Sequence, residues 1–247
     1  MKGLKLVVKI LLDAGHGGKD GGASKNGIHE KDIVLKICKK IQAKLNNYLD
    51  VKVLMSRETD TTLSMEDRTD NANNLKADIL VSVHTNSATT TTAKGFESYR
   101  YITSDAGTIA LQNVMHQEII RAIGGKIVDR GKKSANFHML RESHMKAILT
   151  ENLFISNVAE SNLLKDDSFL DKIAQGHVNG LVKFLGLKLK ERQPIQPTPT
   201  PTPAPPKKPI NEKLYIVQVG AFEHKENAEK LAEDLRKQGY RPLIKYQ

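Results

Sequence analysis

The sequence has no tryptophan and few aromatic residues of any kind, which limits what its positive charge can mean. Aromatic residues make up 5% of the 247 residues, while the formal net charge is +10. Proteins that stack the bases of single-stranded nucleic acid place aromatic side chains among basic ones. We therefore expect no nucleic-acid binding. We expect the charge either to attract anionic wall polymers or only to keep the protein soluble.

Cysteine and long apolar runs are also scarce. The single cysteine, Cys38, excludes an internal disulfide and is expected to be a small core residue. No run of about 18 apolar residues occurs, so we expect no membrane span. Lys5 and Lys9 interrupt the first apolar run, and no small-residue cleavage site follows it, so we recognise no signal peptide. If the protein acts outside the cell, we expect release by lysis, a holin-type pore or a non-standard route.

Proline is absent from residues 1–193 and concentrated just after them. Eight of the nine prolines lie in 194–209, as PIQPTPTPTPAPPKKP. Such a segment lacks the apolar side chains and backbone donors of a packed core, and it favours an extended spacer with about 50 Å of reach. The sequence thus predicts a large domain over 1–193, a linker over 194–209 and a small unit over 210–247.

Strand-like and helix-like segments alternate before the linker. Strands are expected over 5–12, 51–55, 79–83, 96–101 and 146–150. Helices are expected near 33–45, 65–75, 109–123 and 173–185. This alternation predicts an α/β fold with a mostly parallel, twisted sheet flanked by helices. After the linker, a strand over 214–219, a helix over 228–237 and a strand over 242–246 predict a small β-α-β unit.

Three apolar runs end in a residue that can bind a metal ion. They are ILLDAGHGG with His16, ILVSVHTN with His84 and AILTENLF with Glu151. Ligands of open α/β sheets bind beyond the carboxyl ends of the strands, and Glu30 at the start of the first helix faces the same edge. Two imidazoles and a carboxylate suit zinc, with a further carboxylate as general base. A lone histidine after a strand is more often structural, and the glycines around His16 lack the spacing of a phosphate-binding loop.

Several of these motifs together resemble a known family. LLDAGHGGKDGGA, LMSRETD, MEDRTDNANNLKADILVSVHTNS, GFESY, DRGKKSANFHMLRES and AILTENLFISN occur in the order typical of the type-3 N-acetylmuramoyl-L-alanine amidases. The resemblance spans most of residues 5–187. It implies that His16, Glu30 and His84 bind one zinc ion and that Glu151 is the catalytic carboxylate. The implied reaction is hydrolysis of the amide bond between muramic acid and the L-alanine of the stem peptide in peptidoglycan.

Two positions depart from the family pattern. Ala14 replaces the usual proline of Asp-Pro-Gly-His, and Leu153 stands where glycine often follows the catalytic glutamate. Neither change removes a metal-binding atom. A zinc carboxypeptidase or deacetylase acting on the wall, and a non-catalytic basic wall-binding module, remain as alternatives.

Other polar residues near the motifs are interpreted as structural. His29 adjoins Glu30, but adjacent helical positions point in different directions, so both are not expected to reach one ion. His138 and His144 either line a substrate groove or are structural, and Arg141 either binds a stem-peptide carboxylate or forms an internal ion pair. Three further residues are expected to play no direct role in the site, namely Arg57, Arg68 and the tail residue His224.

The tail resembles the first half of a SPOR repeat domain. The likeness rests on YIVQVGAF, the following Asn-Ala helix start and the Gly-Tyr exit. Such domains bind glycan strands stripped of stem peptides, so the resemblance implies wall binding. A full domain needs about twice this length, which leaves either a remnant or two chains pairing their halves as a homodimer. Spore, mother-cell and phage roles are not distinguished.

Overall fold

The structure, a computed structural model, describes residues 7–190, 224–237, 240, 242 and 244. The chain divides into two units, residues 1–193 and 194–247. Among the described residues, no helix is long and apolar enough to cross a membrane.

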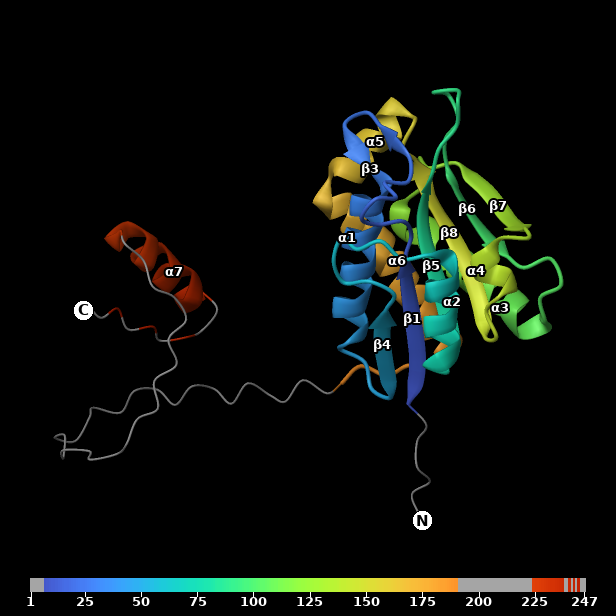
Figure 1. Cartoon of the computed structure of the whole chain (residues 1–247), viewed down its shortest axis with the longest axis horizontal. Helices are drawn as coiled ribbons and strands as arrows, with labels where there is room; N and C mark the ends of the chain where they lie inside the picture. Colours follow the sequence, from blue (N-terminus) through green and yellow to red (C-terminus); the bar gives the residue numbers. More distant parts are fainter. Residues whose placement is uncertain (1–6, 191–223, 238–239, 241, 243, 245–247) are drawn as a thin grey trace, which may run out of the picture. The chain divides into compact units, whose positions relative to one another are not determined.

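A six-stranded sheet with the order β4-β1-β5-β8-β6-β7 forms the centre of the first unit (Figure 1). Its strands are β1 (Val8–Ala14), β4 (Val51–Met55), β5 (Ile79–Asn86), β6 (Phe96–Arg100), β7 (Asp129–Ser134) and β8 (Lys146–Phe154). All neighbours pair in parallel except β6 and β8, which are antiparallel. The predicted α/β fold with a mostly parallel sheet is confirmed.

Helices cover both faces of the sheet, but not to the same extent. One face packs against α1 (Glu30–Leu45), α3 (Ala106–Ile123) and α6 (Asp167–Leu185), and α5 (Val158–Lys165) adjoins α6. The other face carries only α2 (Met65–Asn74) and the short α4 (His138–Arg141), both in front of the sheet in Figure 1. The second face is therefore only partly covered.

Alternation along the central strands decides which residues face each layer. Ile10, Val81 and Ile148 lie in the large core cluster, and the next residues, Leu11, Leu80 and Leu149, lie in the smaller cluster under α2 and α4. Because successive strand residues point to opposite faces, His84 and Glu151 share the face of Leu80 and Leu149. The apolar layer ends at those leucines, and polar side chains continue the face toward the carboxyl ends of β5 and β8.

Local sequence explains how the helices begin and end. The apolar positions of α1 recur every four residues and are buried, as is the expected core cysteine Cys38. Ser64 and Asp67 cap α2 reciprocally, each side chain accepting a hydrogen bond from the other residue's backbone N–H. Gly186 ends α6 at φ 64°, a conformation that glycine adopts without strain.

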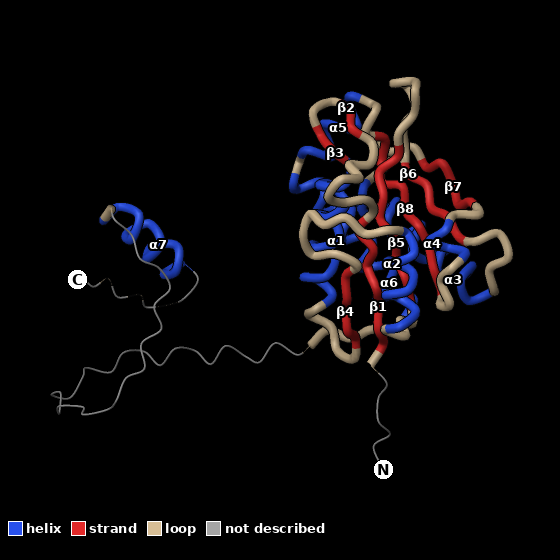
Figure 2. The backbone as a smooth tube through the Cα atoms, viewed as in Figure 1, coloured by secondary structure: helices blue, strands red, loops and turns tan. Residues whose placement is uncertain are grey.

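Several boundaries differ from those expected from the sequence. The first strand continues to Ala14 instead of ending at residue 12, and β5 and β8 run past His84 and Glu151 instead of stopping before them. Helix α1 begins at Glu30, as expected. The pattern did not reveal the hairpin of β2 (Ser24–Lys25) and β3 (Ile28–His29), nor the later elements β7, α4 and α5 (Figure 2). Strand β7 has the sequence DRGKKS, whose exposed polar residues carry no apolar alternation.

In the second unit the structure describes one helix, α7 (Lys225–Lys237), which confirms the helix expected there. The strand expected over 214–219 lies outside the described residues, and so does most of the one over 242–246.

Candidate metal centre

His16 lies in the loop that follows β1, with its backbone at φ 60°. A non-glycine residue rarely adopts this conformation, and it persists only where surrounding contacts hold it. The imidazole Nδ1 lies 2.8 Å from Asp20 Oδ2, four residues along the same loop. A carboxylate on one ring nitrogen fixes the ring and leaves Nε2 as the nitrogen available to a metal.

Glu30 stands between the two candidate imidazoles. Its Oε2 is 3.2 Å from His16 Nε2 and its Oε1 is 3.1 Å from His84 Nδ1. The backbone N–H groups of Ala23 and Thr85 donate hydrogen bonds of 3.0 Å to the same carboxylate. One donor atom from each of the three side chains lies within 4.8 Å of the others, close enough to share one ion.

The electrostatics of this group depend on the shared carboxylate. Burial alone would lower the pKa of His16, but hydrogen bonds and charge from Glu30 and Asp20 outweigh it and raise the pKa to about 9. Burial likewise acts to raise the pKa of Glu30, but the two imidazoles hold it well below its usual value. The group therefore presents a carboxylate that remains ionised at neutral pH.

Two glycines leave room for these rings. A Cβ on Gly15 would lie 2.3 Å from His84 Cε1, and one on Gly22 would lie 2.7 Å from His16 Cδ2 and 2.8 Å from Glu30 Oε2. Any larger residue at either position would displace a candidate ligand.

Two buried arginines hold the loop that carries His16. Arg57 donates to the carbonyls of Ala14 and Gly15, each at 2.9 Å. Arg68 on α2 donates to the Ala14 and His16 carbonyls and pairs with the Asp13 carboxylate at 2.8 Å. Both arginines are therefore structural, as expected, and they organise the backbone of the candidate metal loop.

Glu151 lies beside this group on the next strand. It is the register partner of His84, and its Oε2 is buried without a hydrogen-bond partner among the described residues. Burial raises the pKa of Glu151 to about 7, despite the opposing charge of His84. A carboxyl group that titrates near neutral pH suits general acid–base chemistry.

A second buried carboxylate, Glu97 on β6, is the register partner of Glu151 on its other side. Arg130 Nε donates to Glu97 at 2.8 Å, and Lys133 Nζ also donates to it. These cations hold the pKa of Glu97 below its usual value against the effect of burial. We did not single out Glu97 or Asp20 from the sequence, although Asp20 follows His16 by four residues and could have been recognised as a partner of its ring.

The residues set aside in the sequence lie outside this group. His29 is exposed and its Nδ1 lies 2.7 Å from Ser24 Oγ, and His224 is exposed. His138 Nε2 lies 3.4 Å from the Thr69 hydroxyl, a structural contact. Arg141 donates to Glu142 at 2.6 Å, so its alternative as an internal ion pair is the one observed.

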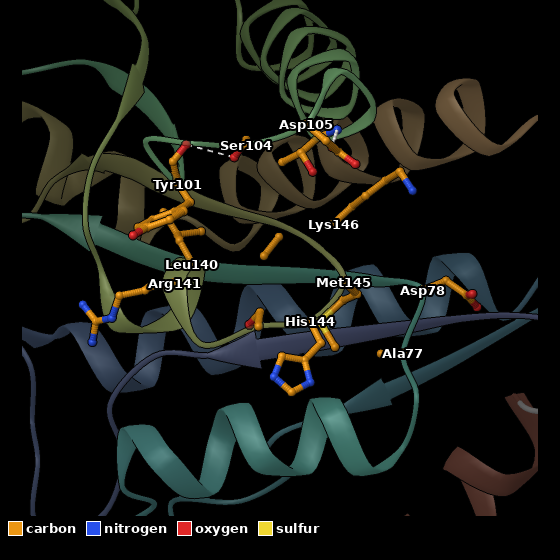
Figure 3. Close-up of a pocket in the computed structure, with 13 residues that line it drawn as sticks. Ala77, Asp78, Tyr101, Ser104, Asp105, Leu140, Arg141, His144, Met145 and Lys146 are labelled. Carbon is orange, nitrogen blue, oxygen red and sulfur yellow. Dashed lines mark hydrogen bonds between the residues drawn. The ribbon is translucent and has the colours of Figure 1, made fainter.

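A cavity of about 460 Å³ lies at the opposite end of β8, and Arg141 and His144 are among the residues that line it (Figure 3). Lys146, also in its wall, precedes Glu151 by five residues, which is about 17 Å along a strand. The cavity is therefore separate from the candidate metal centre.

Comparison with known families gives two matches along the chain. Residues 10–183 match the family described as N-acetylmuramoyl-L-alanine amidase, and residues 211–247 match the SPOR domain. The first match contains all four candidate site residues. The second covers the tail whose likeness to a SPOR repeat the sequence indicated.

Individual relatives agree with the family match. The chain is 42% identical to a sporulation-specific N-acetylmuramoyl-L-alanine amidase of Bacillus subtilis (strain 168), over 96% of this chain and 84% of the relative. It is 49% identical to an endolysin of Bacillus phage SPP1, over 73% of this chain and 67% of the relative.

A solved structure agrees in fold as well. An N-acetylmuramoyl-L-alanine amidase from Clostridium difficile 630 is 36% identical, with a TM-score of 0.71, over 73% of this chain and 97% of that one. Sequence, fold and domain order therefore agree, and the chain belongs to the N-acetylmuramoyl-L-alanine amidases, enzymes that act on peptidoglycan.

Proposed function

We propose that this amidase depends on one zinc ion held by His16, Glu30 and His84, with Glu151 as its general acid and base. The observation that carries the proposal is the convergence of three donor atoms within 4.8 Å of one another, with a buried carboxylate on the adjoining strand. The bond cleaved joins the lactyl group of muramic acid to the L-alanine of the stem peptide.

The donor set fits zinc in kind and number. Two imidazole nitrogens and one carboxylate oxygen are typical of catalytic zinc sites, which use three protein ligands and leave one position open. The Asp20 carboxylate on His16 is the outer partner that such histidines usually have. A bound zinc ion would act as a Lewis acid on the scissile carbonyl and favour ionisation of water at neutral pH.

Glu151 supplies the proton transfers. Its ionised form accepts a proton from the attacking water, and the protonated form returns that proton to the departing alanine nitrogen. A pKa of about 7 leaves both forms populated near neutral pH. The missing hydrogen-bond partner at Oε2 leaves this oxygen available to the water.

Digestion of purified peptidoglycan tests the reaction. Zinc-loaded protein should release intact stem peptides that begin with L-alanine and leave the glycan unbroken, as seen by mass spectrometry. Release of a single terminal residue would instead identify a carboxypeptidase, and release of acetate a deacetylase. Metal analysis should find one zinc per chain, and a metal-free preparation should lose activity and regain it with zinc.

We further propose that the tail binds glycan strands from which stem peptides have been removed, which are products of the same reaction. A tethered binder would raise the local concentration of the enzyme on partly digested wall. Deletion of 194–247 should then reduce binding to glycan prepared free of peptides.

The 37 matched residues are short for a SPOR domain, so we propose that two chains complete one domain as a homodimer. Sedimentation at micromolar concentration tests this: the full chain should be dimeric and the truncated chain monomeric. A monomeric full chain would contradict the homodimer but not the amidase activity.

A further inference from the structure

A cluster of polar side chains continues the site beyond Glu151 toward the edge of the sheet. Glu97 on β6 pairs in register with Glu151, so the two carboxylates share one face of the sheet. Glu97 is only 3% exposed and accepts hydrogen bonds from Asn86 at 2.6 Å and Tyr99 at 2.9 Å. Arg130 and Lys133 on β7 donate to its other oxygen.

The two cations exceed the charge that Glu97 can neutralise. One carboxylate faces a guanidinium and an ammonium, which leaves a net charge of +1 beside the catalytic carboxylate. Both cations remain accessible, since the side chains of Arg130 and Lys133 are 33% and 37% exposed. A structural ion pair needs only one cation, so the second calls for an anionic partner from outside.

The buried carboxylate also fixes where the cations lie. Arg130 stacks on the Phe154 ring, 4.8 Å from its centroid, and Lys133 lies 5.8 Å from the centroid of the Tyr99 ring. Cations held in this way lose little further freedom on binding a ligand. Unused donors remain, since Arg130 Nη2 makes no hydrogen bond within the part of the chain that the structure describes, and Lys133 Nζ donates only to Glu97.

We propose that Arg130 and Lys133 form a subsite for a carboxylate of the stem peptide, namely the free α-carboxylate of its second residue. This inference rests on the proposed function, which places the scissile carbonyl between His84 and Glu151. An extended peptide advances about 3.5 Å per residue, and neighbouring strands lie about 4.8 Å apart. The second residue after the cleaved bond therefore reaches the row of Glu97, one strand beyond Glu151, where the two cations meet.

The neighbouring lysine offers a matched control. Lys132 lies on the same strand, but its Nζ donates to Asn113 on α3 at 2.7 Å, on the opposite face of the sheet. Lys133→Met and Lys132→Met therefore remove the same charge from the same strand, and only the first removes it from the proposed subsite. Lys133→Arg keeps a cation there.

Two soluble substrates test the subsite directly. They are N-acetylmuramoyl-L-alanyl-D-glutamate, with a free α-carboxylate, and the same compound with an α-carboxamide. The zinc-loaded full chain should show a kcat/KM about tenfold higher for the carboxylate, the scale of one hydrogen bond to a charged group. This ratio should fall toward one in Lys133→Met and stay near the wild-type value in Lys132→Met and Lys133→Arg.

The ratio separates the subsite from the chemistry. Loss of Lys133 also changes the field at Glu151, which would slow both substrates equally and leave the ratio unchanged. An unchanged ratio in Lys133→Met, or a wild-type ratio near one, would overturn the subsite while leaving the amidase intact. If wild-type enzyme cleaved neither compound, the proposed function and the subsite would both fail. Should Lys133→Met not fold, the wild-type ratio still decides.

Discussion

His84 on β5 and Glu151 on β8 are register partners, so an imidazole and a buried carboxylate stand side by side on one face of the sheet. This pairing predicts that proton transfer and metal binding can be separated. Glu151→Gln should lower kcat by about two to four orders of magnitude, the usual contribution of a general acid–base. The variant should still bind one zinc per chain, measured by metal analysis after dialysis. A variant with near-normal kcat would remove Glu151 from its proposed role.

Zinc binding to metal-free protein should release protons at pH 7. The pKa of His16 is raised to about 9, so its ring is largely protonated at pH 7 and must lose a proton before Nε2 can bind the ion. Zinc affinity should therefore rise about tenfold per pH unit from 7 toward 9. Calorimetry in buffers of different ionisation enthalpy measures the proton count. Affinity that does not change over this range would contradict the coupling.

The paired arginine under the metal loop should matter for stability. Arg68→Met leaves the Asp13 carboxylate buried without its cation, and breaking a buried pair typically costs about 3–5 kcal/mol of unfolding free energy. Arg121→Met is the control, because Arg121 pairs with Glu118 at the surface and such pairs contribute about 0–1 kcal/mol. Urea unfolding of both variants measures the difference, and equal losses would contradict it.

Leu153 combines a fully buried side chain with a left-handed backbone, φ 67°, in the bulge that follows Glu151. Leu153→Ala should lose about 3–5 kcal/mol through the cavity it leaves. Leu153→Gly loses the same contacts but relieves about 1 kcal/mol of backbone strain. We expect thermal stability in the order leucine, glycine, alanine, and a less stable glycine variant would contradict the strain.

Acid should destabilise the fold through His177. This residue is fully buried on α6 beside the Thr150 hydroxyl, and burial lowers its pKa to about 4 from an unfolded value of 6.5. Between these values the unfolded chain binds the extra proton, so stability falls as pH falls from about 6.5 to about 4, by about 1.4 kcal/mol per unit. Urea unfolding at several pH values should show this slope, and His177→Gln should remove it.

The order of strands and helices could be predicted from the sequence because apolar periodicity reports burial directly. Glu30 could be placed at a helix start, and His84 and Glu151 near the carboxyl ends of strands, since apolar runs precede both. Strand β7 could not be predicted in the same way. As an edge strand it is largely solvated, so its residues carry no apolar pattern.

The missed functional residues were missed for a related reason. Glu97 lies in a strand that reads as ordinary from sequence, and only its pairing with Glu151 gives it meaning. Arg130 and Lys133 look like two of many surface cations until Glu97 brings them to one point.

By itself the sequence determined the α/β fold class, the helix within the tail and the amidase motifs, because each is written in contiguous residues. Only the tertiary structure decided that Glu97, Glu151 and His84 form one row across three strands. It also decided that the surplus charge of β7 lies at the end of that row. Strand register and the direction of side chains depend on packing between distant segments, which a local pattern does not specify.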